Sequence, residues 1–428
     1  MTFVISGGLC AQPISPPLPA DTLSTEIEQL RSEVVELRTQ MNSREIPQSE
    51  LLTPPIDPQK IVRTGEFRGA FQIPGTDVSL RIGGYARGDT FYDTGYVSTG
   101  IQLFPSAIAL DGSPLDGRRG QTTLTGSQSR LNFDAQSMTE IGRLRGFVEI
   151  DFLQNDVNPR MRHAFGEWEV EDTDLIGGHT WSTFMDPAAL PFVVAETTAV
   201  GAIFRRQGMF RIQHQLNECT SFAVAIEAPR SNDYTLPQPA TDQPFGRWPD
   251  LVARIRFAES DTGSLQIASL VRGIGFENSA GQETQRAGWG LAITSRVNVG
   301  DKDNIRMGVS GGQGIGSYLA GLGTDLSAAG PAIDGYQTLD AVGAYAAYQH
   351  IWSEQCFSNA YYGYSYVEST PLMPATAGKV TDNAGLNLIW SPRPTFGIGV
   401  EYSYGFREVR NGTSGDNHRI QFTVQFGP

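Results

Sequence analysis

Apolar and polar residues alternate with a period of two along most of this chain. In residues 79–87, Leu80 and Ile82 alternate with Arg81, and residues 143–152 repeat the pattern. Because successive side chains of a strand point to opposite faces, each segment predicts a strand with one apolar and one charged face. A soluble sandwich shows the same alternation, but its repetition without intervening helices predicts a closed barrel with an apolar outside and a wet inside.

From Val78 onward the pattern predicts about sixteen strands, many of them long enough to cross a bilayer at a tilt. The fold class is therefore all-β, an antiparallel transmembrane β-barrel. No stretch approaches the roughly 20 apolar residues of a spanning helix. The predicted strands are 78–93, 127–138, 141–153, 161–171, 174–184, 205–216, 219–229, 248–259, 263–273, 288–299, 303–314, 339–351, 355–368, 381–392, 395–408 and 417–426.

The predicted connections alternate between long and tight, which is typical of outer-membrane barrels with long external loops and short periplasmic turns. The long ones are 94–126, 154–160, 185–204, 230–247, 274–287, 315–338, 369–380 and 409–416. An even strand number places both chain ends in the periplasm. Aromatic residues near the predicted periplasmic ends fit an interfacial girdle: Trp168, Trp352, Trp390 and Phe426.

The first 70 residues differ in pattern from the rest. Residues 1–20 resemble the end of a secretory leader followed by a proline-rich segment, residues 46–70 are a second proline-rich linker, and residues 71–428 form the barrel. Residues 21–45 carry apolar positions spaced 4, 3, 4, 3, 4, a short heptad seam that predicts a periplasmic coiled coil, with a parallel trimer preferred over one amphipathic helix. The seam consists of Leu23, Ile27, Leu30, Val34, Leu37 and Met41.

Composition narrows the possible partners. Hydrophobic content is 39% and the formal net charge is −14, which argues against nucleic acid as a partner. Lys60, Lys302 and Lys379 are the only lysines among 32 basic residues, and arginine is the side chain suited to planar contacts with carboxylates. The cysteines and histidines have no metal-ligand spacing, and we expect no cofactor and no metal.

Many arginines fall on the face opposite the apolar one, and a charge on the lipid face costs roughly 2–4 kcal/mol at mid-membrane. We expect these side chains to point into the lumen, where they either pair with acids such as Asp89, Asp134, Glu149, Asp151 and Glu167 or form an uncompensated stripe that attracts anions. The candidates are Arg81, Arg87, Arg130, Arg143, Arg145, Arg211, Arg254 and Arg256, together with Arg272, Arg296 and Arg306.

One connection is unusually apolar and rich in proline. The segment from Thr183 to Arg205 is long, and it predicts either a loop that folds into the lumen and narrows it or a packed external loop. Its candidate constriction residues are Met185, Asp186, Pro187 and Leu190. Enzymatic motifs are weak: His179 and Ser182 suggest a lipase-like pair, but no third group is evident.

Several of these segments together resemble the DcaP-like trimeric porins, a Gram-negative family associated with uptake of dicarboxylic acids. The resemblance is carried by residues 73–76, 82–87, 130–134, 146–152, 163–166 and 178–187. It implies a sixteen-stranded trimeric barrel that passes small anionic solutes through an arginine-lined constriction. By position, it implies that the lining includes Arg81, Arg87, Arg130, Arg143 and Arg145.

The sequence therefore predicts a passive porin in the bacterial outer membrane, a homotrimer surrounded by outer-membrane lipid. Two alternatives remain, an esterase-like barrel enzyme and a plugged structural or adhesive barrel. The chain departs from the usual outer-membrane pattern at its end, where Gly427 and Pro428 follow the last aromatic residue, Phe426.

Overall fold

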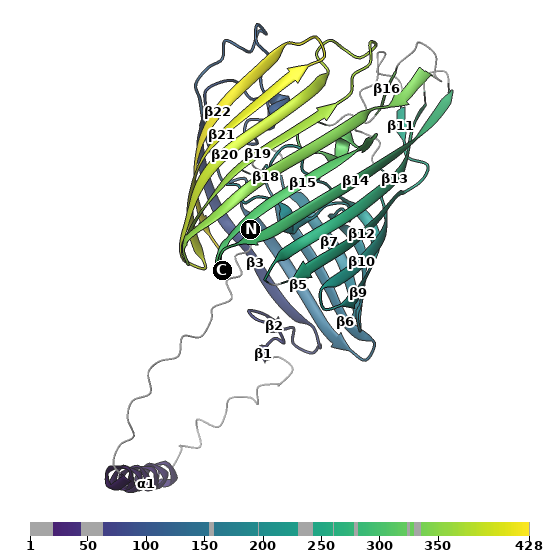
Figure 1. The fold of residues 1–428 in the computed structure, drawn as a ribbon. Coiled ribbons are helices and arrows are strands. Elements are labelled where there is room, and N and C mark those ends of the chain that lie inside the picture. The colour runs from purple at the N-terminus through teal and green to yellow at the C-terminus, as the bar shows by residue number, and fades with distance from the viewer. Residues whose placement is uncertain are drawn as a thin grey trace. The chain divides into compact units, whose positions relative to one another are not determined.

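A computed structural model describes residues 20–43, 63–153, 158–195, 197–229, 243–259, 261–277, 281–322, 326–328 and 335–427. The chain divides into two compact units, residues 1–63 and 64–428. Helix α1 (Ala20–Ser43) belongs to the first unit, and strands dominate the second (Figure 1). The leader, including Cys10, and most of the predicted linker lie outside the described residues. No described helix is both long and apolar enough to span a bilayer.

The second unit is a closed antiparallel barrel of sixteen strands, as predicted. Each strand pairs with the next along the chain, and the last pairs with the first through Phe426 opposite Ala86. The barrel strands are β3 (Ser79–Asp93), β5 (Arg130–Thr139), β6 (Gly142–Asp151), β7 (Arg160–Val170), β8 (Thr173–Trp181), β9 (Arg206–Asn217), β10 (Thr220–Glu227), β12 (Asp250–Glu259), β13 (Gly263–Glu277), β14 (Glu283–Val299), β15 (Asp303–Gln313), β18 (Asp340–Ser353), β19 (Cys356–Val367), β20 (Gly378–Arg393), β21 (Phe396–Val409) and β22 (Ser414–Phe426).

Shorter elements decorate the ends of the barrel strands and the connections between them. The sequence pattern did not predict them, because two to five residues are too few to show a period. They are β1 (Arg63–Thr64), β2 (Phe71–Gln72), β4 (Gln121–Thr125), β11 (Gln243–Phe245), β16 (Leu326–Ala328) and β17 (Tyr336–Thr338), with the 3-10 turns η3 (Pro105–Ala107), η4 (Pro187–Ala189) and η5 (Gly316–Tyr318).

The alternation seen in the sequence sorts the side chains between the two faces of the wall. Outward apolar residues remain exposed, for example Phe210 at 70% and Ile82 at 51%, whereas inward polar residues such as Asn304 and Gln421 are buried. The apolar outer surface suits a hydrocarbon environment. The backbone suits it as well, because every backbone group of a closed barrel is already paired.

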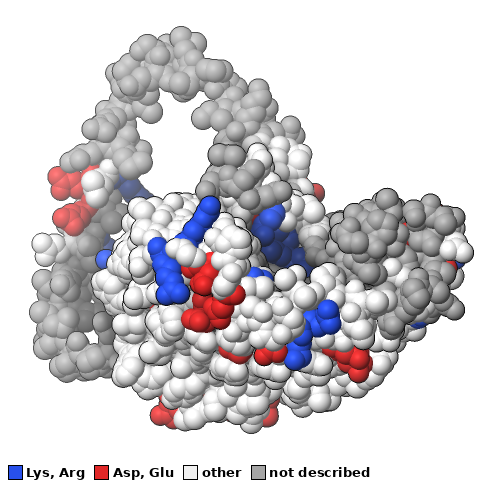
Figure 2. All heavy atoms as spheres, turned by 90° about the horizontal axis from the view of Figure 1, so that it is seen from above, with Lys and Arg blue, Asp and Glu red and all other residues white. Residues whose placement is uncertain are grey.

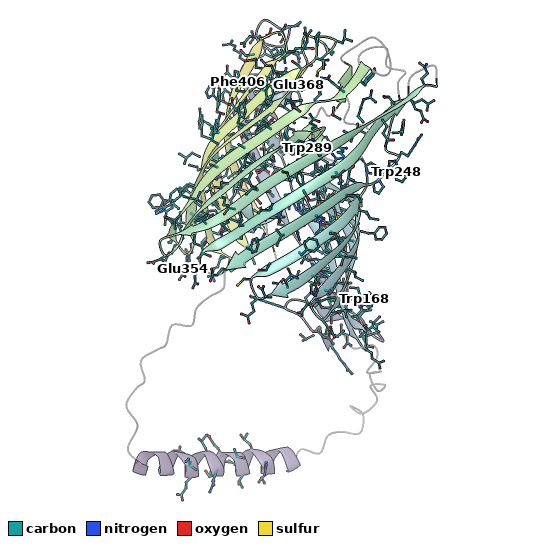
Figure 3. All side chains as sticks on the ribbon, turned by 45° about the vertical axis from the view of Figure 1, so that its right-hand side comes forward. Trp168, Trp248, Trp289, Glu354, Glu368 and Phe406 are labelled. Atoms are coloured by element: carbon teal, nitrogen blue, oxygen red, sulfur yellow. The ribbon has the colours of Figure 1, made fainter. Side chains whose placement is uncertain are left out.

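The connections are short at one end of the barrel and mostly long at the other, which we call the short-turn end and the long-loop end. In Figure 3, Trp168 and Glu354 lie toward the short-turn end, and Glu368 and Phe406 lie toward the other. One predicted connection is wrong in length. Residues 274–287 are mostly strand, because β13 runs to Glu277 and β14 starts at Glu283, where inward Thr284 and Arg286 continue the period of two.

Candidate functional site: the lumen and its two loops

The connection from β8 to β9 lies against the inner wall of the barrel. We call residues 182–205, described apart from residue 196, the inner loop. Phe184, Met185 and Ala199 are fully or almost fully buried. The inner loop also hydrogen-bonds inward side chains of strands on the opposite side of the barrel: the Val194 amide donates to Glu401 Oε2 at 2.7 Å. These contacts place it inside the lumen.

Small residues on the inner wall let the inner loop approach the strands closely. A Cβ added at Gly363 in β19 would lie 2.3 Å from the Val200 carbonyl oxygen, and one at Gly343 in β18 would lie 2.3 Å from the Gly201 oxygen. No real side chain fits at such distances. The inward glycines of β18 and β19 therefore form a track on which the inner loop lies.

Polar side chains of the same wall satisfy the backbone of the inner loop. Asn383 Oδ1 accepts from the Val200 amide at 2.8 Å, and Asn387 Nδ2 donates to the Phe192 carbonyl at 2.9 Å. A buried loop needs such partners, because an unpaired backbone group away from water costs free energy. The sequence contains these asparagines, but nothing in its pattern links them to a loop nearly 200 positions away.

A second connection, after β15, joins the inner loop inside the barrel. Residues 314–322 run antiparallel to it, with the Gly201 amide donating to the Ala320 carbonyl at 2.9 Å and the Phe204 amide donating to the Tyr318 carbonyl at 2.9 Å. The sequence pattern predicts a strand over residues 303–314, followed by a long connection. β15 does end at Gln313, but the pairing of the next residues with the inner loop was missed.

Tyr318 anchors the inner loop and residues 314–322 to strands β12 and β13. Its ring is completely buried, and its hydroxyl donates to Asp250 Oδ2 at 2.6 Å. The guanidinium carbons of Arg205 and Arg272 lie 4.3 and 5.3 Å from the centre of the ring. Two cations on one desolvated ring are favourable cation–π contacts, so the tyrosine joins one residue of the inner loop to β12 and β13.

The predicted arginines of β3, β5 and β6 all pair with acids on their own or neighbouring strands. We call β3 and β5–β7 the acid-paired wall, in which the buried Asp134 pairs with two arginines. The pairs are Arg81–Asp134 (3.0 Å), Arg87–Asp89 (2.8 Å), Arg130–Glu149 (3.6 Å), Arg143–Glu169, Arg145–Asp134 (2.8 Å) and Arg145–Glu167 (3.2 Å). Seen from above, basic and acidic side chains also lie close together at the long-loop end of the molecule (Figure 2).

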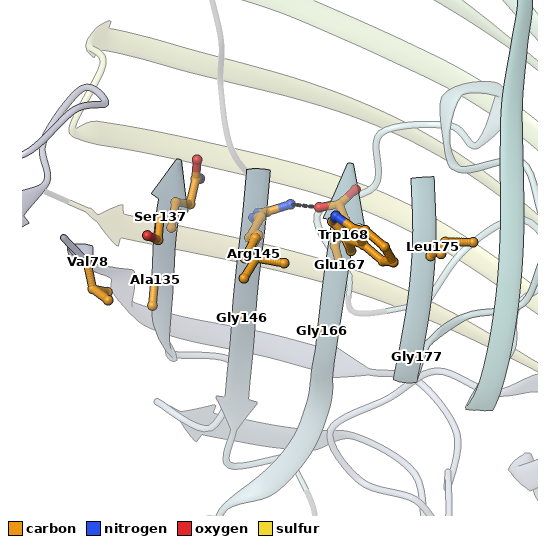
Figure 4. A pocket seen from close by; sticks show the side chains of 12 residues that line it. Val78, Ala135, Ser137, Arg145, Gly146, Gly166, Glu167, Trp168, Leu175 and Gly177 are labelled. Carbon is orange, nitrogen blue, oxygen red and sulfur yellow. Dashed lines mark hydrogen bonds and ion pairs between the residues drawn. The ribbon is translucent and has the colours of Figure 1, made fainter. Parts of the chain in front are cut away.

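The Arg145–Glu167 pair lies beside a groove of about 620 Å³ (Figure 4). Four small residues in register across β5–β8 form its floor, and Leu144, Trp168 and Leu175 lie beside them. The floor consists of Ala135, Gly146, Gly166 and Gly177. By the alternation of the strands these residues belong to the outward face, so the groove is on the outside of the acid-paired wall.

Four predicted arginines of β9–β15 have different surroundings, whereas Arg272 pairs with Asp250 at 3.4 Å. We call this part of the inner face the arginine wall. Arg254 donates to Gln213 Oε1 at 2.5 Å, and Arg211 donates to Thr183 Oγ1 at 2.7 Å. Arg296 and Arg306 face each other directly across β14 and β15. Among the described residues, Arg211, Arg254, Arg296 and Arg306 form no ion pair with a carboxylate.

Arg256 connects the arginine wall to the inner loop. Its Nη1 lies 2.7 Å from Asp186 Oδ1, and Asp186 Oδ2 accepts a hydrogen bond from Thr294 Oγ1 at 3.0 Å. Of the other predicted loop residues, Met185 and Asp186 are buried, Pro187 is exposed, and the Leu190 carbonyl accepts from Arg306 at 2.6 Å. The structure thus brings Arg256 and the predicted loop residues together. Arg81 and Arg87 pair instead with acids of the acid-paired wall, and Arg87 also donates to the Val194 carbonyl of the inner loop.

The predicted lipase-like pair has another arrangement. The Ser182 hydroxyl is buried and donates to Glu227 Oε2 at 2.7 Å, and Gln207 also donates to this oxygen. A hydroxyl that donates to a buried carboxylate anchors the start of the inner loop, which is a structural role.

In the first unit, α1 confirms the predicted helix but leaves its pairing open. Ile27, Leu30, Val34 and Leu37 are all exposed, each by about half of its surface, between 45% and 59%. The side chains of Leu23 and Met41 lie outside the described residues. A stripe of exposed apolar residues on one helix is typical of a coiled-coil seam, and its role as a trimerisation seam stays a prediction.

Comparison with known proteins identifies the family. The model of the DcaP outer membrane protein family matches residues 71–427. The chain belongs to the DcaP outer membrane protein family. The crystal structure of the outer membrane channel DcaP of Acinetobacter baumannii is similar to this chain at a TM-score of 0.72 and 20% identity, covering 86% of this chain and 100% of that one.

The fold of this DcaP family member is also similar to that of other solved outer-membrane proteins. An anion-selective porin from Comamonas acidovorans has a TM-score of 0.56 at 8% identity, and covers 82% of this chain and 100% of its own. A loop-deletion mutant of OmpT, an outer membrane protein of Vibrio cholerae, has a TM-score of 0.51 at 12% identity. The match covers 82% of this chain and 100% of the OmpT chain. A search of curated proteins gave no match. The fold is that of outer-membrane channels.

Proposed function

We propose that this protein is a passive outer-membrane channel that prefers small anionic solutes, dicarboxylates among them, and passes them between the inner loop and the arginine wall. The observation that carries the proposal is the different pairing of the two walls. Arginines of the acid-paired wall are neutralised by neighbouring carboxylates, whereas Arg254 and Arg296 are not paired with a described carboxylate. In a narrow wet path between low-dielectric walls, such unbalanced charge produces a strong local potential.

The proposed assembly is a homotrimer in outer-membrane lipid, with the N-terminal segment in the periplasm. Support comes from the exposed apolar stripe on α1, which a parallel coiled coil would bury. An even number of strands brings both ends of the barrel chain to the short-turn end, which is the periplasmic side in outer-membrane barrels.

A plugged barrel is the second candidate, and one observation favours it. The inner loop and residues 314–322 build an apolar cluster inside the lumen, which includes Phe184, Ile203 and Leu319. If this cluster fills the cross-section, no path remains beside it. For the enzymatic alternative, the bond from Ser182 to Glu227 gives no support.

Planar-bilayer recording of the purified full-length protein under a KCl gradient tests the proposal. We expect conductance steps in groups of three and a reversal potential that reports anion preference. Well-folded protein without conductance contradicts the open channel and favours the plugged barrel. A cation-selective reversal potential contradicts the solute preference alone.

A further inference from the structure

Asp186 stands out because it is a carboxylate of the inner loop held on the arginine wall. It binds Arg256 at 2.7 Å and Thr294 at 3.0 Å, and its side chain is completely buried. It also caps η4, accepting from the Ala188 amide at 3.1 Å. The inner loop thus presents one negative charge to a surface that carries several positive ones.

The strand register shows what surrounds this carboxylate. Arg256, Gln266 and Thr294 lie side by side on β12, β13 and β14. The next inward row toward the short-turn end contains Ser264, then Arg296 opposite Arg306. Like charges directly opposite each other destabilise a sheet, so the barrel keeps this pair of arginines at a cost in stability.

Several polar groups around Asp186 have no partner. The Gln266 side chain is 1% exposed, and neither its Nε2 nor its Oε1 has a hydrogen-bond partner among the described residues. The Ser264 hydroxyl and the Nε of Arg296 are likewise buried and unpaired. Buried polar groups are normally hydrogen-bonded. Three of these atoms are donors, the Nε2 of Gln266, the Ser264 hydroxyl and the Nε of Arg296, so they have hydrogen-bonding capacity for an anion in addition to Asp186.

We propose that Arg256, Gln266, Arg296 and Ser264 form a binding site for a small carboxylate, and that Asp186 is a tethered carboxylate that competes with the solute for it. The resident carboxylate lowers the net positive charge that a passing solute meets. Conduction requires that binding be strong enough to admit a solute and weak enough to release it. Asp186 therefore sets how fast the solute leaves.

The inference rests on the proposed channel function, and one set of bilayer recordings separates the two. Acetate is the probe, added to KCl, and its inhibition of the current measures occupancy of the site. In Asp186→Asn, which keeps the cap on η4, we expect half-inhibition at a roughly ten-fold lower acetate concentration, because one nearby negative charge is lost. We also expect the reversal potential to report a stronger preference for anions.

Two controls separate charge from loop anchoring. Glu401→Gln replaces a buried carboxyl group at another anchor of the inner loop, at Val194, and Thr294→Val removes a partner of Asp186 without changing charge. We expect neither variant to reproduce the changes in half-inhibiting acetate concentration and reversal potential of Asp186→Asn. Equal shifts in Glu401→Gln and Asp186→Asn would overturn the proposal, since displacement of the loop would then explain both.

A further variant keeps the test decisive if Asp186→Asn does not fold. Arg296→Gln removes a side chain that forms no ion pair with a described residue, and we expect it to raise the half-inhibiting acetate concentration by about ten-fold. Unchanged acetate inhibition in this variant would overturn the site. A cation-selective wild-type channel in which Asp186→Asn still shifts toward anions would contradict the proposed function but support the site.

Discussion

The acid-paired wall and the arginine wall contain the same residue type in the same inward orientation, yet their electrostatics differ. In the acid-paired wall, Arg145 lies between Asp134 and Glu167 on the two neighbouring strands. In the arginine wall, the register neighbours of Arg254 are Ala223 and Ala268. Alternation along a strand decides which way an arginine points, but the strands on either side decide whether its charge is cancelled.

The largest expected effect is on ion selectivity. We predict that replacing both Arg254 and Arg296 with glutamine lowers the anion-to-cation permeability ratio by roughly ten-fold, because each change removes a charge without a described counter-charge. Reversal potentials in a KCl gradient measure it. The matched control is the neutral double variant Arg145→Gln with Asp134→Asn in the acid-paired wall. A similar ratio in both double variants would contradict the distinction between the walls.

The next effect is on stability, and here the acid-paired wall is expected to be more sensitive to substitution than the arginine wall. Arg87→Gln leaves Asp89 buried without its 2.8 Å ion pair and removes a hydrogen bond to the inner loop at Val194. We predict a loss of about 3 kcal/mol in the free energy of unfolding, since removing one partner of a buried pair leaves an uncompensated charge. Urea unfolding followed by tryptophan fluorescence measures it. Arg254→Gln should lower the free energy of unfolding by less. An equal decrease in the two variants would argue against the difference between the two walls.

The smallest expected effect is the change in ion selectivity on adding one carboxylate to the arginine wall. Gln213 Oε1 already accepts from Arg254 at 2.5 Å, so Gln213→Glu supplies a carboxylate with almost no change of shape, although it also removes the hydrogen bond that Gln213 Nε2 donates to Asp174 at 3.2 Å. We predict a decrease of roughly two-fold in the anion-to-cation permeability ratio, since the new charge neutralises one arginine. Gln215→Glu, on the same strand in an exposed turn-end position, is the control. A ratio unchanged by Gln213→Glu would show that Arg254 does not influence permeation.

Much of the barrel could be predicted from the sequence because it depends on local patterns. All sixteen strands follow from the period of two, and the inward direction of Arg256 or Arg296 follows from the same rule. Strand ends were less certain where the period continues beyond the bilayer, as in β13 and β14.

The lumen could not be predicted in the same way, because its contacts join distant segments. Nothing in the segment around Val200 specifies Asn383 or Gly363 as its neighbours. The Tyr318 anchor has the same origin, since Asp250 becomes its partner only when residues 314–322 turn inward. A signal was present in the inward glycines of β18 and β19, which leave space that a barrel filled by side chains would not need.

The junction of β3 and β22 has a consequence for how the barrel forms. Groups 335 positions apart in the chain meet there, with the Thr423 hydroxyl donating to the Gly88 carbonyl. Ring closure over such a separation is slow, because a large loss of chain entropy precedes the stabilising contacts. A segment pressed as tightly onto the interior as Gly201 on Gly343 has little room to enter a finished cylinder. We therefore expect the inner loop to be in place before the first and last strands meet, so that the order of assembly is fixed by geometry.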